Sequence, residues 1–170
     1  MKKVLLIAMI IGSMIESCRN TDKEESSIVR LTNCEGLISD TLGTNDNAKI
    51  FMPSAFTSNG DGKNDMIKPT VANATTISYT LYNSSNTIVF STTQQNQGWV
   101  APTIPSNSYT VYYYKIQITT TANRKIGICG EVYNLSCYPP AIPRSNIYFE
   151  DQLRFNGFTA ATTEVLPNCQ

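Results

Sequence analysis

The sequence predicts an all-β protein, an antiparallel β-sandwich with a signal segment and linker before it and a C-terminal extension after it. Ser, Thr and Asn carry most of the polarity, and charged residues make up only 15% of the chain. Several short runs alternate apolar and polar residues, and after residue 18 no stretch keeps a helical period. At 170 residues the chain holds one domain and a tail.

The first strands follow from alternation and turn residues. Residues 49–56 read as a strand interrupted by Pro53, which suits a sheet edge because proline cannot donate to a ladder. Residues 76–92 read as a hairpin with its turn at 84–86. After it, Trp99 is expected to anchor the core or its rim.

Two longer strands are expected next. Residues 109–120 form the strongest strand, with four residues of one parity facing the core: Tyr112, Tyr114, Ile116 and Ile118. Residues 126–137 return beside it, and their apolar parity changes at Gly130, which predicts a β-bulge there. Antiparallel strands with turn-rich joints favour a sandwich.

The N-terminus reads as a lipoprotein signal peptide over residues 1–17. Two lysines precede an apolar run over 4–11 that is too short to span a bilayer, and Ile15-Glu16-Ser17-Cys18 resembles a bacterial lipobox. Cys18 is the expected lipidation site, and a diacyl chain would anchor the protein in the outer membrane. The alternative is an ordinary signal peptide with an unmodified cysteine. Residues 18–48 are assigned to a tether or linker, 49–138 to the domain, and 139–170 to a Pro-rich extension expected to fold back, held by Cys169.

Four cysteines remain when Cys18 is set aside: Cys34, Cys129, Cys137 and Cys169. An even number in an exported chain favours two disulfides over free thiols. Cys129 and Cys137 flank a strand and would lie about 26 Å apart, so they cannot pair. Cys34 and Cys169 therefore each take one of them, and we favour Cys34–Cys129 with Cys137–Cys169.

Composition excludes several function classes. The formal net charge is zero, so no bulk field favours nucleic acid. The chain has no histidine, which excludes a Ser-His-Asp triad, a Cys-His pair and a His-ligated metal. A hydrolase would need paired carboxylates such as Glu150 and Asp151, and adjacent strand residues point to opposite faces. We expect no enzymatic activity.

Residues 59–65, Asn-Gly-Asp-Gly-Lys-Asn-Asp, concentrate oxygen donors and glycines. Asn59, Asp61 and Asp65, with Asn64, are candidate ligands for Ca²⁺, which takes 6 to 8 oxygens from short loops. The alternative is a metal-free turn in which Asn and Asp side chains bond the backbone and glycines take positive φ. We favour the metal-free turn.

Residues 50–136 resemble the gliding motility-associated C-terminal domain family of Bacteroidetes, also called the type B sorting domain of the type IX secretion system. The family pattern Pro-x-Ala-Phe-Thr-Pro-Asn-Gly-Asp-Gly-x-Asn-Asp is matched over residues 53–65, with Ser58 in place of the second proline. The resemblance implies an immunoglobulin-like sandwich in an exported protein. In secreted members this domain ends the chain and directs export, whereas 34 residues follow it here.

These observations predict a non-enzymatic, lipid-anchored protein of the cell envelope, facing either the cell surface or the periplasm, with a structural, adhesive or protein-interaction role. The expected partners are the outer membrane, through the lipid, and an envelope protein or a glycan. Because the chain has nine tyrosines and Trp99, the alternative function is a calcium-dependent glycan-binding surface module. That alternative requires exposed, coplanar aromatic rings.

Overall fold

A computed structural model of the chain describes residues 34–44, 46–154 and 157–170. The predicted signal peptide and the predicted lipidation site, Cys18, lie outside these residues. The described part is nearly all β, with two single-turn 3₁₀ segments, and none of its helical segments could cross a membrane. Its elements are β1 (Lys49–Phe51), β2 (Ala55–Phe56), β3 (Thr70–Ala72), β4 (Ala74–Tyr82), β5 (Ile88–Thr92), β6 (Tyr109–Thr120), β7 (Lys125–Leu135), η1 (Arg144–Asn146), η2 (Glu150–Gln152), β8 (Leu153–Arg154) and β9 (Gly157–Phe158).

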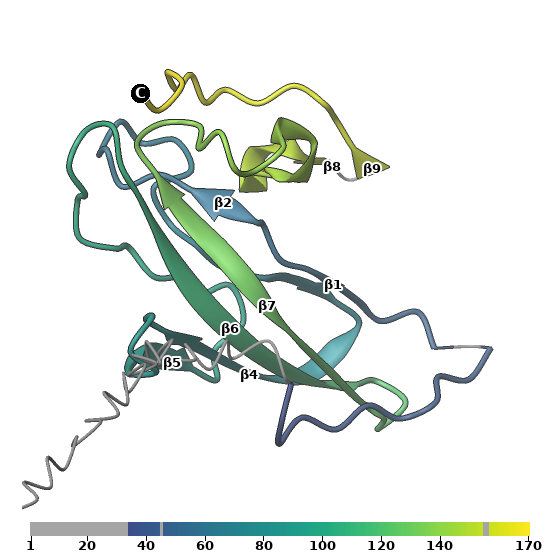
Figure 1. Cartoon of the computed structure of the whole chain (residues 1–170). Helices are drawn as coiled ribbons and strands as arrows, with labels where there is room; N and C mark the ends of the chain where they lie inside the picture. Colours follow the sequence, from purple (N-terminus) through teal and green to yellow (C-terminus); the bar gives the residue numbers. More distant parts are fainter. Residues whose placement is uncertain (1–33, 45, 155–156) are drawn as a thin grey trace, which may run out of the picture.

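A five-stranded sheet in the order β2-β7-β6-β4-β5 forms the main layer. The long β6–β7 hairpin runs through its centre (Figure 1). β4 and β5 form the predicted hairpin, and β4 also pairs antiparallel with β6. β2 pairs with β7 in parallel, so the sheet is mixed at this one edge. The all-β sandwich prediction is confirmed.

β1 and β3 form a second, two-stranded sheet that packs over the main one. Pro53 does interrupt the first strand, and its two halves, β1 and β2, join different sheets. The core between the layers contains the three residues of β4 that share one face, Ile77, Tyr79 and Leu81. Trp99 packs edge-to-face on Tyr112 at 5.0 Å between ring centroids and is bridged to Ile67. The predicted role of Trp99 as a core anchor is confirmed.

The predicted bulge at Gly130 is wrong. β6 and β7 keep one continuous register from Tyr109↔Leu135 to Thr119↔Lys125. Gly130 pairs with Tyr114, and a Cβ there would lie 2.8 Å from the tyrosine hydroxyl, so glycine makes room for that ring. The apparent change of parity has another cause: Tyr133 and Leu135 point to the outer face of the sheet, where other residues bury them.

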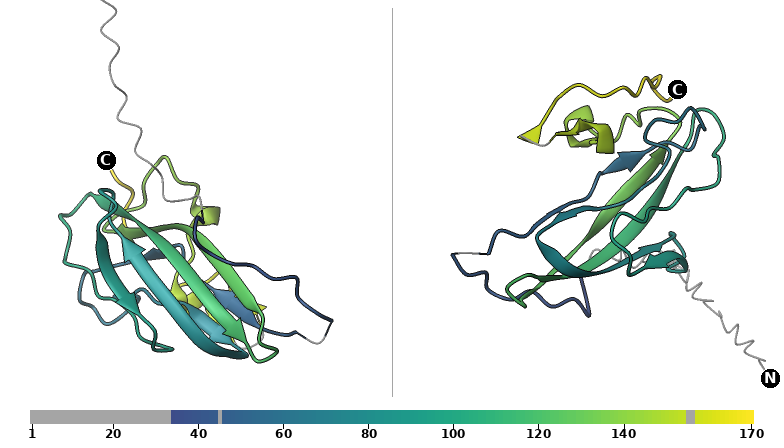
Figure 2. Two further views of the ribbon diagram at one scale, coloured as in Figure 1. Left: turned by 90° about the horizontal axis from the view of Figure 1, so that it is seen from below. Right: turned by 180° about the vertical axis from the view of Figure 1, so that it is seen from behind.

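Both terminal segments cover that outer face. Along one end of β6 and β7, Ile38 exchanges two hydrogen bonds with the Gln117 side chain, and the Asp40 carboxylate accepts the backbone N–H of Lys125 at 2.7 Å. At the other end the C-terminal extension crosses near β2 (Figures 1 and 2). The described part of the segment assigned to a tether is thus bonded to the sandwich.

Each terminal segment is joined to the sheet by a disulfide. Cys34 is bonded to Cys129 in β7, across 95 residues of sequence. Cys137, just after β7, is bonded to Cys169, across 32 residues. This is the connectivity favoured by the distance argument. The Cys34–Cys129 bond lies at the surface, whereas Cys137 is fully buried.

Asparagine supplies the turns. Among the residues that the structure describes, six non-glycine residues have positive φ and all are asparagines, among them Asn86 in the β4–β5 turn and Asn123 in the β6–β7 turn. Asparagine tolerates the left-handed region because its short amide bonds the local backbone. The high Asn content of the chain therefore reflects its many tight joints.

The Tyr79 hydroxyl allows a test of how the core is packed. Tyr79 is fully buried, and its hydroxyl has no hydrogen-bond partner within the described residues. Burial, and the nearby Tyr114, raise the pKa of this hydroxyl. An unpaired buried hydroxyl is costly, so we expect Tyr79→Phe to raise the free energy of unfolding by about 1 kcal/mol in urea titrations. A loss of similar size would contradict this.

Candidate functional site

The Asn-Gly-Asp-Gly-Lys-Asn-Asp segment forms a compact loop after β2, closed by its own side chains. Both carboxylate oxygens of Asp65 accept backbone N–H bonds, from Gly60 at 2.8 Å and from Gly62 at 2.6 Å. Gly60 and Gly62 have φ of +77° and +83°, which a residue with a Cβ rarely adopts. We call residues 57–65 the signature loop.

Further bonds in the signature loop have the same pattern. The Asn59 side-chain oxygen accepts the Asp61 N–H at 3.2 Å, and an Asp61 carboxylate oxygen accepts the Lys63 N–H at 2.9 Å. The base of the loop is closed by the Thr57 N–H, which donates to the Asn64 carbonyl at 2.9 Å. The loop is therefore built as the self-bonded turn described above.

This bonding argues against calcium in the loop. Asp65 already uses both oxygens on backbone donors, and the Asn59 and Asp61 side-chain oxygens also accept backbone N–H groups. We expect the melting temperature of the mature protein to be the same in millimolar CaCl₂ as in chelator. We also expect Asp65→Ala to cost about 1–3 kcal/mol of stability in both solutions, because two N–H groups lose their acceptor. A calcium-dependent rise in melting temperature that Asp65→Ala abolishes would restore the calcium hypothesis.

Ser58 occupies a position where the family pattern has proline, and its hydroxyl forms two hydrogen bonds. The Ser58 hydroxyl donates to the Pro102 carbonyl at 3.1 Å and accepts from the Asn134 amide at 2.9 Å. Asn134 is fully buried in β7. The serine therefore links the signature loop to β7 and to the segment that follows Trp99.

The C-terminal extension docks onto the signature loop at Asn64. The Asn64 side-chain oxygen accepts the backbone N–H of Asp151, and its amide nitrogen donates to a Glu164 carboxylate oxygen, both at 3.2 Å. The Thr57 hydroxyl donates to the same Glu164 oxygen at 3.3 Å. Asn64 has φ of +49°, and its side chain bonds two points of the extension that lie 13 residues apart.

Glu164 is 5% exposed, which is unusual for a carboxylate. Burial raises its pKa above the ordinary value, with added repulsion from Asp61 and Asp151, and the bonds from Asn64 and Thr57 offset only part of this. A raised folded pKa means that the folded state binds this proton more tightly than the unfolded state does. The stabilisation is present below the unfolded pKa and is lost as pH rises through the folded pKa.

Glu164→Gln tests this sign. As pH falls from neutral towards 4.5, the ordinary value for Glu, the wild-type chain should gain stability relative to the variant. Urea unfolding at a series of pH values measures the difference. A difference that is constant with pH would contradict the account.

Asp151, which also contacts Asn64, has a pKa shift in the opposite direction to that of Glu164. Burial raises the pKa of this carboxyl, but hydrogen bonds from Thr163, Thr162 and Asn64 lower it more, and the net shift is downward. Its carboxylate accepts the Thr163 N–H at 2.5 Å and the Thr162 hydroxyl at 2.9 Å. The neighbouring Glu150 forms an ion pair with Lys68 at 3.1 Å. Both members of the carboxylate pair considered for hydrolysis are thus bonded to protein groups.

A second surface feature is a shallow hollow of about 360 Å³ lined by three aromatic residues: Phe51, Tyr148 and Phe158. Phe158 stands edge-to-face to Phe51 at 66° and to Tyr148 at 87°, with centroids 5.1 and 5.2 Å apart. Sugar stacking on several rings requires them to lie coplanar. These rings do not, so their geometry does not favour the glycan-binding alternative.

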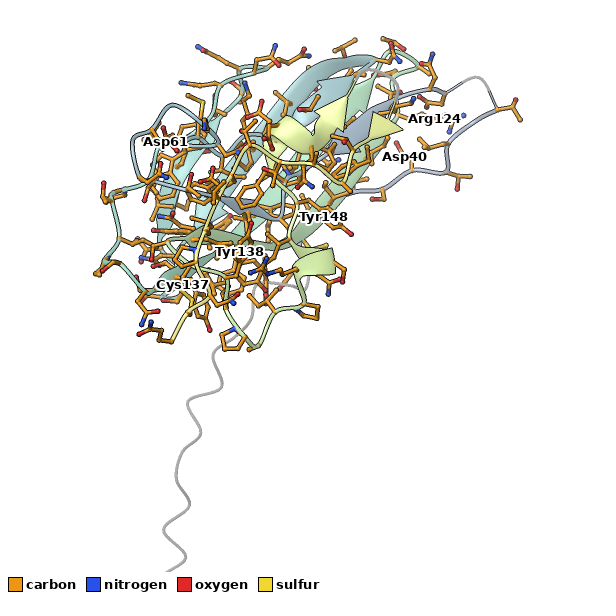
Figure 3. The ribbon with its side chains drawn as sticks, turned by 90° about the horizontal axis from the view of Figure 1, so that it is seen from above. Asp40, Asp61, Arg124, Cys137, Tyr138 and Tyr148 are labelled. Carbon is orange, nitrogen blue, oxygen red and sulfur yellow. A yellow bond between two sulfur atoms is a disulfide. The ribbon has the colours of Figure 1, made fainter. Side chains whose placement is uncertain are left out.

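Figure 3 shows that the two terminal segments cover different ends of the sheet. Asp40 and Arg124 mark the end of the sheet covered by the N-terminal segment, and Cys137 and Tyr138 mark the end covered by the extension. The four loop residues singled out from the sequence, Asn59, Asp61, Asn64 and Asp65, do lie together. Sequence reasoning considered Asp151 only as a hydrolase carboxylate and missed Glu164, because both lie far from Asn64, by 87 and 100 residues, and follow no local motif.

Comparison with known proteins identifies one region. Residues 50–130 match the family model of the CHU_C Type IX secretion signal domain. No curated protein and no solved structure has significant similarity to the chain. The matched segment runs from β1 into β7 and contains the whole signature loop. The match indicates a role related to secretion sorting and a secreted or envelope-associated protein.

Proposed function

We propose, from the match of residues 50–130 to the family model of the CHU_C type IX secretion signal domain and from the lipobox-like sequence before Cys18, that the protein is a non-enzymatic, lipid-anchored component of the cell envelope. Its sandwich serves as a structural or protein-interaction module at the outer membrane. It does not act as an active sorting signal. A β-rich exported domain with two disulfides suits that compartment.

One observation carries the module role: the extension occupies the signature loop. Asn64 bonds both Asp151 and Glu164, and the Cys137–Cys169 disulfide keeps the extension beside β7. A signal must be reached by the machinery that reads it. In this chain Ala55, Thr57 and Asn64 of the family motif are bonded to the extension, which supports a static role.

The anchor rests on the lipobox-like sequence before Cys18. Two or more acyl chains, each stabilised by about 0.8 kcal/mol per buried CH₂, give stable attachment. Sixteen residues from Cys18 to Cys34 reach at most about 55 Å when fully extended. That length would hold the sandwich close to the membrane surface.

Metabolic labelling with radioactive palmitate tests the anchor. The wild-type chain should incorporate label and sediment with outer membranes. Cys18→Ala should lose both properties, whereas the matched control Ser26→Ala should keep them. Equal labelling of Cys18→Ala and wild type would refute lipid anchoring. Protease treatment of intact cells then tests orientation, since an outward-facing sandwich is cleaved and a periplasm-facing one is protected.

A further inference from the structure

The extension is bound to the sheet as a peptide would be. β2 pairs with β7 on one side, and on its other side residues 146–148 run along it. The Tyr148 carbonyl accepts the backbone N–H of Ser54 and that of Ala55, both at 3.0 Å. The Ser54 hydroxyl accepts the Tyr148 N–H at 2.7 Å and donates to the Asn146 carbonyl at 2.8 Å. The Tyr148 carbonyl and the Ser54 hydroxyl thus hold this segment, whose first residue lies in η1, along β2.

Side chains on alternate positions anchor this segment of the extension. Ile147 and Phe149 are 5% and 1% exposed and pack with Ala55 and Leu135, while Tyr148 between them is 40% exposed. Tyr133 and Ile142 complete the cluster. We call the surface formed by Ala55, Tyr133 and Leu135 the shelf. The shelf accepts apolar side chains at positions i and i+2 of the extension.

A polar clamp follows the apolar pair. Asn64 accepts the Asp151 N–H and, with Thr57, binds the buried Glu164 carboxylate. Together β2, the shelf and the clamp form one groove, which we call the β2 groove. Its occupant has the chemistry apolar-x-apolar followed by acidic residues.

The connection between groove and occupant permits exchange. The extension leaves the sheet after β7, and Cys137 holds it there through Cys169. A Pro-rich joint with Pro139, Pro140 and Pro143 precedes residue 147. A second copy of the chain carries the same segment and would make the same bonds. The formal net charge of zero means that no bulk repulsion opposes the approach of two copies.

We propose that the β2 groove is a peptide-binding groove, filled in cis by residues 146–151 and by Glu164, that accepts the same residues of a second copy when the Cys137–Cys169 disulfide is absent. The disulfide favours the closed monomer, because it fixes both ends of the extension beside one β7. Exchange breaks no covalent bond and preserves every contact in the groove. This inference is independent of the lipid anchor.

A trans peptide tests the groove itself. The full mature chain carrying Ile147→Asp and Phe149→Asp, with both disulfides intact, is titrated against a fluorescent peptide of residues 144–166. Saturable binding is expected, weakened roughly tenfold by adding Asn64→Ala, which removes clamp hydrogen bonds. A peptide with the same two aspartates should not bind, whereas one with Tyr148→Asp, at the exposed position between them, should bind. No binding of the native peptide to a chain that is folded by near-ultraviolet circular dichroism overturns the proposal.

Light scattering after size exclusion tests the exchange. The chain with Cys137→Ala and Cys169→Ser should form a dimer whose fraction rises with concentration, while the wild-type chain stays monomeric. Adding Ile147→Asp and Phe149→Asp to that variant should abolish the dimer. A Cys137→Ala, Cys169→Ser chain that stays monomeric up to millimolar concentration overturns the exchange, as does a dimer that survives the two aspartates.

Discussion

Replacing Cys34 and Cys129 by serine is expected to lower the free energy of unfolding by about 4–5 kcal/mol. The disulfide closes a loop of 95 residues, and the chain-entropy estimate of its effect on the unfolded state rises with the logarithm of loop length. The folded state is weakened too, since the docked contacts of Ile38 and Asp40 lose their covalent anchor. Urea unfolding followed by circular dichroism measures the loss.

The second disulfide provides the comparison. Cys137–Cys169 closes a loop across only 32 residues, so its removal should cost somewhat less, about 4 kcal/mol. Because the Cys34–Cys129 bond is at the surface and Cys137 is buried, mild reductant should open Cys34–Cys129 first. A loss below about 1 kcal/mol for the Cys34/Cys129 variant would mean that the N-terminal segment adds nothing to the folding unit.

Phe149→Ala is expected to cost about 3–5 kcal/mol, the range for deleting a fully buried aromatic side chain. Phe149 is 1% exposed and packs with Leu135 on the outer face of the sheet, although it lies in the extension. Phe158→Ala is the matched control, because Phe158 is 48% exposed and should cost under 1 kcal/mol. Both are measured by urea unfolding.

The shape of the Phe149→Ala transition carries further information. If the extension and the sandwich form one cooperative unit, far-ultraviolet and near-ultraviolet signals should shift together to lower urea concentration. Two separate transitions, with the sandwich unfolding at its wild-type midpoint, would show that the extension is a separate and dispensable unit. We expect the single transition, because buried contacts join the extension to β2 and β7.

Alternation in the sequence predicted the strands well where one face meets the core and the other meets water. β4 is such a strand, with Ile77 and Tyr79 buried on the expected face. Ile116 and Ile118 in β6 are also buried as expected, although the N-terminal segment lies along the other face of β6. The rule misled at Gly130, because β7 is covered on both faces near its end. The residues that cover it, Ile147 and Phe149, come from the extension, and no local sequence pattern predicts such a contact.

The candidate site, too, could be predicted from the sequence only in part. Bonds within the signature loop join residues at most seven apart, and the Asn, Asp and Gly pattern predicted a self-bonded turn. The clamp at Asn64 depends on Glu164, 100 residues away, so it became visible only with the fold. The disulfide pairing was accessible from the sequence only in part, because an extended strand between Cys129 and Cys137 excludes one connectivity and leaves two.

The central claim is that both terminal segments are fastened to the outer face of one sandwich, and disulfide mapping tests it most directly. Mass spectrometry of the unreduced protein should use trypsin with Glu-C, because trypsin alone leaves Cys129 and Cys137 in one peptide and Glu131 lies between them. We predict that Cys34 is linked to Cys129 and Cys137 to Cys169. Free thiols at these positions, or Cys34 linked to Cys137, would contradict the account.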